Sequence, residues 1–144
     1  MAYWLYITNP QNGEVTIKNN LLGAAERHIN TVAKVNKGDR ILIYEVGDLG
    51  EKKARIVGEF EAESEMFKER TEVFHQTAKT PNEIFPLRIK LRPLNMFPTP
   101  VEVVPLVPEL SFITNKRHWA GPIRGKVLVE IPKNDHDLIV SKAA

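Results

Sequence analysis

Residues 23–44 read GAAERHINTVAKVNKGDRILIY, and the order of patterns in this stretch decides the fold. Apolar residues recur at helical spacing and predict a helix over Ala24–Val35 with one face on a core. Gly38 is the residue type expected to cap that helix in a left-handed conformation. The run RILIYEV then predicts a strand over Arg40–Val46, and two glycines with four charges make Gly47–Lys53 a loop.

Strand patterns lie on both sides of this stretch. The aromatic and β-branched run YWLYIT predicts a strand over Tyr3–Thr8, which the turn pair Asn9-Pro10 ends. Ala54–Glu63 alternates as a half-buried hairpin partner would. Pro86–Pro93, PLRIKLRP, has the clearest alternation and predicts a cationic outer face. Its inward residues are Leu87, Ile89 and Leu91, and its outward residues are Arg88, Lys90 and Arg92.

The remaining segments give weaker patterns. Ser64–Asn82 is polar and predicts a mixture of short helix and loop, with Phe67 and Phe74 as its large apolar residues. Five of the ten prolines fall in Pro93–Pro108, which must therefore run extended with at most short edge strands such as Val101–Val104. Alternation predicts a last strand over residues 127–131, and Asn134 is a suitable cap for a terminal helix.

These elements predict an α+β fold in a single domain spanning residues 1–144. Five or six short strands with two or three peripheral helices indicate a small, closed or nearly closed mixed β-barrel. Hydrophobic residues at 42% and charged residues at 26% are typical of globular proteins, and no apolar run is long enough for a membrane helix. With no cysteine, the chain suits a reducing cytosol, so we expect a soluble cytoplasmic protein.

Catalytic patterns are missing from the sequence. The four histidines are scattered with no pair at metal-ligand spacing, which argues against a metal site. No serine sits in a glycine-flanked elbow, and no glycine-rich phosphate loop follows a strand. The alternating carboxylates of Glu59, Glu61 and Glu63 are typical of a solvated strand face. We therefore expect no catalytic residues, no metal and no cofactor.

Charge is unevenly distributed although the net charge is only +2. Residues 45–72 hold nine acidic and five basic side chains, whereas residues 86–126 hold seven basic and two acidic ones. Cations next to aromatic side chains, as in the string KRHW at 116–119, suit phosphates and unstacked bases. The alternative is that the two halves mix in space and the outward cations only keep the protein soluble.

Four strings in order resemble one family: YWLYITNP, LLGAAERHINTVAKVNKGDRILIY, PLRIKL and LSFITNKRHW. They look like the EVE domain family, whose PUA-like barrel is related to the YTH domains that read methylated adenine in RNA. The resemblance covers nearly the whole chain. Its most specific part is residues 23–44, where Gly, Glu-Arg-His, Asn-Thr and Lys-Gly-Asp fall as the family pattern places them.

The resemblance implies a PUA-like barrel with a cleft between the helix after the first strand and the barrel mouth. The resemblance further implies that a single nucleobase, in the first instance a modified one, is extruded into that cleft, whose walls must compensate for the lost stacking. The positions expected to line or border it are Asn9, Leu22, Gly23, His28, Asn30, Tyr44, Thr80 and Trp119. The cations expected to contact phosphates are Arg27, Arg88, Lys116, Arg117 and Arg124.

Two positions depart from the family pattern. Leu22 stands where the family usually has a tryptophan, and Thr80 stands where an aromatic often precedes the Pro-Asn string. A methyl-reading aromatic cage needs several π faces, so the identity of the ligand stays open. The leading hypothesis is a non-catalytic module that binds RNA or DNA, as a monomer or weak homodimer and without a membrane. The alternative is a protein that binds a free nucleobase or nucleoside, while an enzyme acting on a base lacks supporting residues.

Overall fold

A computed structural model of the chain describes residues 1–47 and 53–143, so most of the predicted loop Gly47–Lys53 lies outside the described residues. The strands are β1 (Tyr3–Thr8), β2 (Leu21–Ala24), β3 (Arg40–Glu45), β4 (Arg55–Ala62), β5 (Phe67–Lys68), β6 (Leu87–Glu102) and β7 (Leu128–Ile131). The α-helices are α1 (Pro10–Asn19), α2 (Ile29–Val32) and α3 (Lys133–Ser141), with 3₁₀ turns η1 (Glu26–His28) and η3 (Val104–Glu109).

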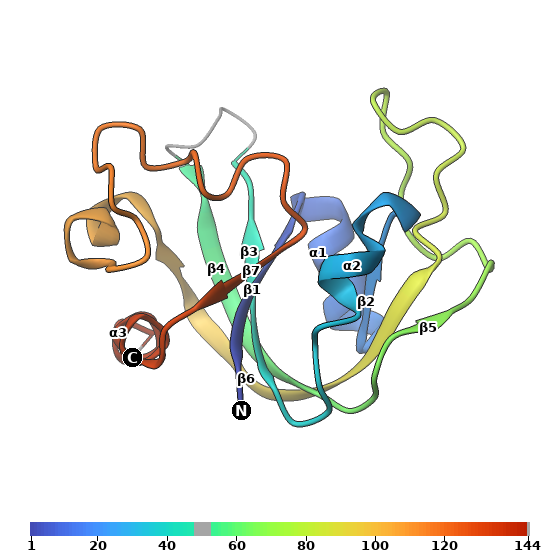
Figure 1. Ribbon diagram of the computed structural model, residues 1–144, viewed down its shortest axis with the longest axis horizontal. Helices are drawn as coiled ribbons and strands as arrows, with labels where there is room; N and C mark the ends of the chain where they lie inside the picture. The colour runs from blue at the N-terminus through green and yellow to red at the C-terminus, as the bar shows by residue number, and fades with distance from the viewer. Residues whose placement is uncertain (48–52, 144) are drawn as a thin grey trace.

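The strands form one mixed sheet in the order β2-β6-β4-β3-β1-β7, with β5 paired to β6. Strands β1 and β3 run parallel, and the other pairs are antiparallel. The sheet curls into a half-barrel, with α1 and α2 on one side and α3 near the opposite rim (Figure 1). The α+β class is confirmed, and the barrel is open because β2 and β7 remain the two ends of the sheet.

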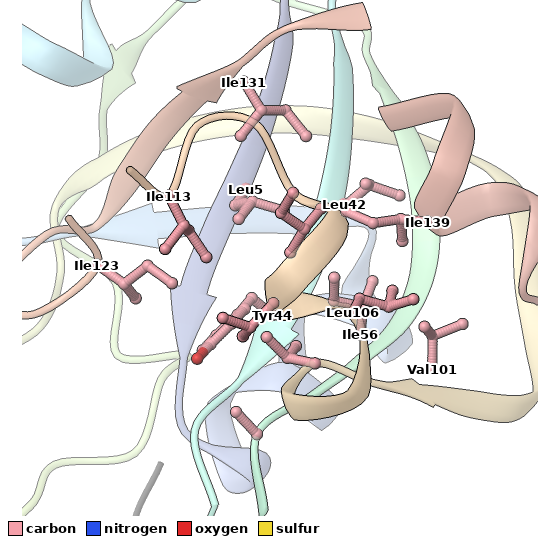
Figure 2. Close-up of a cluster of buried hydrophobic side chains, with 14 of the residues drawn as sticks. Leu5, Leu42, Tyr44, Ile56, Val101, Leu106, Ile113, Ile123, Ile131 and Ile139 are labelled. Atoms are coloured by element: carbon pink, nitrogen blue, oxygen red, sulfur yellow. The ribbon is translucent and has the colours of Figure 1, made fainter. Parts of the chain in front are cut away.

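Two clusters of buried side chains fill this fold. One gathers apolar residues of β1, β3, β4, η3 and α3, and Figure 2 shows Leu5, Leu42 and Ile139 converging in it. The other lies between β2, α2 and the first half of β6, where Leu22, Val32 and Ile89 are completely buried. Burial of apolar surface in both clusters fixes the curl of the sheet, since each pleated face must be covered.

The region between β1 and β3 differs from the predicted single helix. Ala24 belongs to β2, where it pairs with Leu87, so the chain arrives as a strand before it turns. The apolar stripe nevertheless faces the core as predicted, because Val32 and Val35 are fully buried. The polar stretch around Gly13, which gave no clear pattern, forms the ten-residue helix α1. Asn9-Pro10 is not merely a turn: Asn9 is the N-cap of α1 and Pro10 begins the helix.

Strand β6 is longer than the sequence predicted and runs through three of the prolines to Glu102. Its second half pairs with β4 alone, and an edge tolerates residues that lack an N–H. The predicted strand end at Val104 is wrong because η3 begins there. The prediction that Arg88 points outward is also wrong. The segment after β5 folds over that face of the strand, and the Arg88 side chain is fully buried.

The terminal helix α3 is confirmed, but Asn134 is not its cap. Pro132 occupies the N-cap position, and Asn134 lies within the first turn. The carboxylate of Asp135, fully buried, instead accepts hydrogen bonds from Ser111 N at 2.8 Å, Ser111 Oγ at 3.0 Å and Phe112 N at 2.8 Å. These bonds attach α3 to the loop that follows η3.

A second contact attaches α3 to the sheet through His136. Its Nε2 atom meets the buried Glu59 carboxylate, its Nδ1 atom lies 2.9 Å from Asp137 Oδ1, and its ring lies 4.5 Å from that of Tyr3. Arg40 also approaches Glu59, at 4.0 Å. Burial of the ring lowers the pKa of His136, but the hydrogen bonds to Glu59 and Asp137 outweigh burial and raise that pKa above its ordinary value.

We expect this contact to make stability depend on pH. Because the pKa of His136 is raised in the folded state, its stabilisation is complete below about pH 6.5, the unfolded value. The stabilisation is lost as pH rises through the folded pKa. The melting temperature of the wild type should therefore fall with rising pH relative to that of His136→Gln. If the melting temperatures of the two proteins change equally with pH above about pH 6.5, the prediction is contradicted.

Candidate functional site

A cleft of about 370 Å³ opens where β1 ends, between η1, the segment after β5 and the residues that lead into β7. This volume falls within the range of about 300–1,000 Å³ typical of ligand sites. The residues that line it are Tyr6, Ile7, Thr8, Asn9, Asn12, Gly23, Ala24, Ala25, Arg27, His28, Phe74, Thr77, Lys79, Thr80, Phe85, Gly125, Lys126 and Val127.

The inner part of the cleft is fixed by contacts to Gly23 on β2. The Tyr6 hydroxyl donates to Gly23 O at 2.7 Å and accepts from Gly23 N at 3.3 Å, which ties β1 to β2. Burial raises the pKa of Tyr6, so this phenol stays protonated. The Phe74 ring packs where a Cβ on Gly23 would be, and it meets Phe85 edge to face with ring centroids 6.0 Å apart.

The start of α1 forms the next wall. Asn9 has an extended backbone, and its Oδ1 atom accepts from Asn12 N at 2.7 Å, which caps the helix. Pro10 then begins the helix with a preset backbone angle. The cap fixes the direction in which the chain leaves β1, and it places the Asn9 and Asn12 side chains at the cleft.

The rim of the cleft is cationic. Arg27, Lys79 and Lys126 come from three separate segments, all have exposed side chains, and none forms an ion pair with another described residue. Every lining residue is described, and none of them is acidic. Cations that gather at a concave surface without carboxylates produce a positive potential that attracts anions.

His28 adds a neutral polar group beside this rim. Burial lowers the pKa of His28 and the neighbouring Arg27 charge lowers it further, while Glu83, which does not line the cleft, opposes the shift. The imidazole is therefore neutral at pH 7, with one nitrogen donating and the other accepting. Within the described residues no hydrogen bond occupies the ring, so both nitrogens can serve a ligand.

Four of the eight residues predicted for the pocket line this cleft: Asn9, Gly23, His28 and Thr80. The other four do not. Leu22 is completely buried in the core, and Asn30 is exposed away from the cleft. Tyr44 is buried among the side chains of the first cluster, as Figure 2 shows, and Trp119 packs against the same cluster. Alternation along β3 faces Tyr44 away from β2, which explains why Tyr44 does not line this cleft.

Of the five cations predicted to contact phosphates, one lines the cleft and four do not. Arg27 is at the rim, but Arg88 is buried, which leaves it no surface for an external anion. Lys116 donates its ammonium to Leu110 O, and Arg117 is exposed on the loop before β7. Arg124 lines a separate, mostly apolar cavity of about 220 Å³, which also holds Tyr44 and borders the cleft at Ile7 and Gly125.

A larger hollow of about 650 Å³ lies elsewhere, along β4, the end of β6 and η3. Its lining mixes Lys53, Arg55 and Lys142 with Glu102 and Glu109, and Arg55 is already paired with Glu45. Because cationic and anionic side chains are mixed in its lining, this hollow has no strong preference for an anionic ligand. In the described part of the chain no three His, Asp or Glu side chains are grouped as a metal site would require, and no helix is long and apolar enough to cross a membrane.

The chain is similar to known proteins in sequence and in fold. The family model of the EVE domain matches residues 2–142. A UPF0310 protein of Pyrococcus abyssi is 41% identical over 146 residues, which cover 98% of this chain and 99% of that protein. The chain belongs to the EVE domain family.

Solved structures share the fold of this EVE domain at much lower identity. Human THYN1, solved in complex with DNA containing 5-methylcytosine, has a TM-score of 0.63 at 10% identity, with 99% of this chain and 98% of that chain covered. The YTH domain of Mmi1 has a TM-score of 0.61 at 7% identity, with coverages of 98% and 86%. The PUA-like fold is therefore confirmed.

The cleft of this EVE domain contains residues that the patterns did not identify. The pattern around Tyr6 indicates a strand and nothing more, Asn12 lies in a polar stretch without periodicity, and Lys79 and Lys126 have no distinctive neighbours in sequence. Phe74 was recognisable as an isolated large apolar residue in a polar segment. Thr80 shares a hydrogen bond of 2.8 Å with the Thr77 hydroxyl, so this wall is polar where the family pattern often has an aromatic. The aromatic surface comes instead from Phe74 and Phe85.

Proposed function

We propose that this EVE domain is a non-catalytic nucleic-acid-binding module that holds one flipped nucleobase in the cleft. The observation that carries the proposal is a cleft without acidic lining residues, with the cations Arg27, Lys79 and Lys126 at its rim and a neutral His28 beside them. Phosphates need the cations, and an unstacked base needs hydrogen-bonding and apolar walls. The DNA complex of human THYN1, a structural relative, supports the same polymer class.

Each part of the cleft has a role in this proposal. Arg27, Lys79 and Lys126 contact the backbone phosphates on either side of the flipped nucleotide. His28 and the Asn9 amide hydrogen-bond the edge of the base, because both present polar atoms to the cleft. Phe85, half-buried, offers an aromatic face to the base. Since Thr80 replaces an aromatic wall, we propose that the cleft depends less on a methyl group than an aromatic cage would.

Titration with short single-stranded DNA tests the proposal. Three probes are needed: one with a central 5-methylcytosine, one with cytosine and one with an abasic site at the same position. We expect the probes with a base to bind roughly tenfold or more tightly than the abasic probe, because stacking contributes about 1–3 kcal/mol per base. We also expect every affinity to fall as salt rises. RNA versions of the probes identify the preferred polymer.

Two outcomes would contradict the proposal. Binding that does not depend on salt, or equal affinity for the abasic probe, would exclude a flipped base with phosphate contacts. A rise in melting temperature with free nucleosides, without oligonucleotide binding, would favour a small-molecule-binding protein that uses the same cleft.

A further inference from the structure

One wall of the cleft is a segment without regular secondary structure. Residues 70–85 follow β5 and precede β6, and Figure 1 shows them as a long excursion from the sheet. Although they form neither helix nor strand, they provide a large share of the cleft lining. The lining residues in this segment are Phe74, Thr77, Lys79, Thr80 and Phe85. The shape of the cleft therefore depends on what holds this segment in place.

Arg88 holds both ends of the segment. Its Nε atom donates to Phe85 O at 2.8 Å, and its Nη2 atom donates to Ile84 O at 3.0 Å and to Thr71 O. Its Nη1 atom lies 3.2 Å from Thr71 Oγ1 and 3.3 Å from Glu69 Oε2. One guanidinium, with its rigid fork of donors, thus joins the beginning of the wall to its end.

The same guanidinium also supports the aromatic part of the wall. Its central carbon lies 5.3 Å from the centroid of the Phe74 ring, which in turn packs on Gly23 and Phe85. The arginine side chain is completely buried, and burial lowers the pKa of Arg88 while Glu69 opposes the shift. A buried cation of this kind is stable only while its hydrogen bonds are made, so the wall and Arg88 order each other.

Asn12 holds the middle of the segment from α1. Its Nδ2 atom donates to His75 O at 3.1 Å, and its Oδ1 atom accepts from His75 N at 2.6 Å. Asn12 is 5% exposed, so these bonds are shielded from water. Within the described residues, Arg88 and Asn12 make all the hydrogen bonds that link the backbone of 70–85 to the rest of the protein.

We propose that Arg88 and Asn12 are positioning residues for base recognition, which fix the 70–85 wall so that Phe74, Phe85 and the threonine pair meet the base. This inference rests on the proposed function. Neither residue contacts a phosphate: Arg88 has no exposed surface, and the Asn12 amide is engaged with His75. Losing either should therefore weaken discrimination of the base without changing the salt dependence of binding.

The test uses the full chain with Arg88→Met, Arg88→Lys and Asn12→Ala. Arg92→Met is the matched control for Arg88, since Arg92 lies on the same strand, is exposed and pairs with Glu61. Asn19→Ala is the control for Asn12, since Asn19 lies on α1 and its side-chain amide, among the described residues, bonds Val15 O and not the 70–85 segment. Hydrogen exchange of residues 70–85 is compared with that of β3, and the 5-methylcytosine and abasic DNA probes are titrated at several salt concentrations.

We expect Arg88→Met and Asn12→Ala to speed exchange in 70–85 while β3 stays protected. The affinity ratio between the two probes should fall about tenfold, towards one, at an unchanged salt slope. Arg88→Lys, with its charge but fewer donors, should lie between Arg88→Met and the wild type. If Arg88→Met unfolds the protein, Asn12→Ala still tests whether fixing the 70–85 wall is needed for base recognition.

Several results would overturn the inference. Unchanged exchange in 70–85, or an unchanged probe ratio, would show that these residues do not position the wall. A reduced salt slope in Arg88→Met would indicate a direct phosphate contact instead. If the wild type binds neither probe, the proposed function fails, while the exchange data still show separately whether Arg88 and Asn12 hold the segment.

Discussion

Replacing Gly23 with alanine is expected to destabilise the fold by about 1–3 kcal/mol and to remove base discrimination, because the new methyl group would overlap the Phe74 ring. That ring cannot move away freely. It is 7% exposed and is held between the Arg88 guanidinium and the Phe85 ring. The clash would displace the aromatic wall of the cleft and with it the surface proposed to meet the base. Chemical denaturation and the three DNA probes measure the two effects.

Two variants show whether the clash is the cause. Gly58→Ala is the matched control, because the closest atoms to its methyl group would be the end of the flexible Met96 side chain, which is 36% exposed and can rotate away. The backbone oxygen of Asn95, 3.1 Å from the new carbon, then has to shift only slightly. We expect Gly58→Ala to lower the free energy of unfolding by less than about 1 kcal/mol. In a Phe74→Leu background, Gly23→Ala should cost at least about 0.5 kcal/mol less than in the wild type. Equal costs in both backgrounds would rule out the Phe74 contact as the source.

The sequence predicted the sheet better than the connections. Strands such as Tyr3–Thr8 and the one beginning at Arg40 were located within a residue or two, because buried strands carry their pattern in consecutive residues. The helix predicted over Ala24–Val35 failed in its first part. Its first residue, Ala24, pairs with β6, and the chain then forms a 3₁₀ turn before the short helix α2 begins at Ile29. Asn9-Pro10 combines a good cap with a good first residue, so helix α1 was recognisable from sequence.

The expected cleft residues lie mostly at regular elements, and Thr80, expected from the family resemblance, is the exception in the irregular segment 70–85. Asn9, Gly23 and His28 belong to β1, β2 and η1 or their ends, and these elements carry the resemblance to the family. Residues 70–85 have no periodicity, so Phe74 and Lys79 could not be assigned to the cleft. Arg88 shows a different limit. Alternation assigns side chains to faces, but it does not reveal that a loop covers the outer face and buries an arginine there.

Removing the rim charges together is expected to have the largest effect on binding. In the triple variant Arg27→Ala, Lys79→Ala and Lys126→Ala, three proposed phosphate contacts are lost, and each contact contributes close to one unit of salt slope. The slope should fall by about 2–3, and affinity at 0.1 M salt should fall roughly 100- to 1,000-fold. The three side chains are exposed and have no ion-pair partner among the described residues, so stability should hardly change.

The matched control removes the same charge from elsewhere. Lys34, Lys37 and Lys142 are exposed and do not line the cleft, and their replacement by alanine changes the net charge equally. If attraction by total charge governed binding, both triple variants would lose affinity alike. If the rim contacts phosphates, only the first loses its salt slope, while its ratio of affinities for the 5-methylcytosine and abasic probes persists. That ratio depends on the inner walls of the cleft. It therefore distinguishes residues that contact the phosphate backbone from residues that recognise the base.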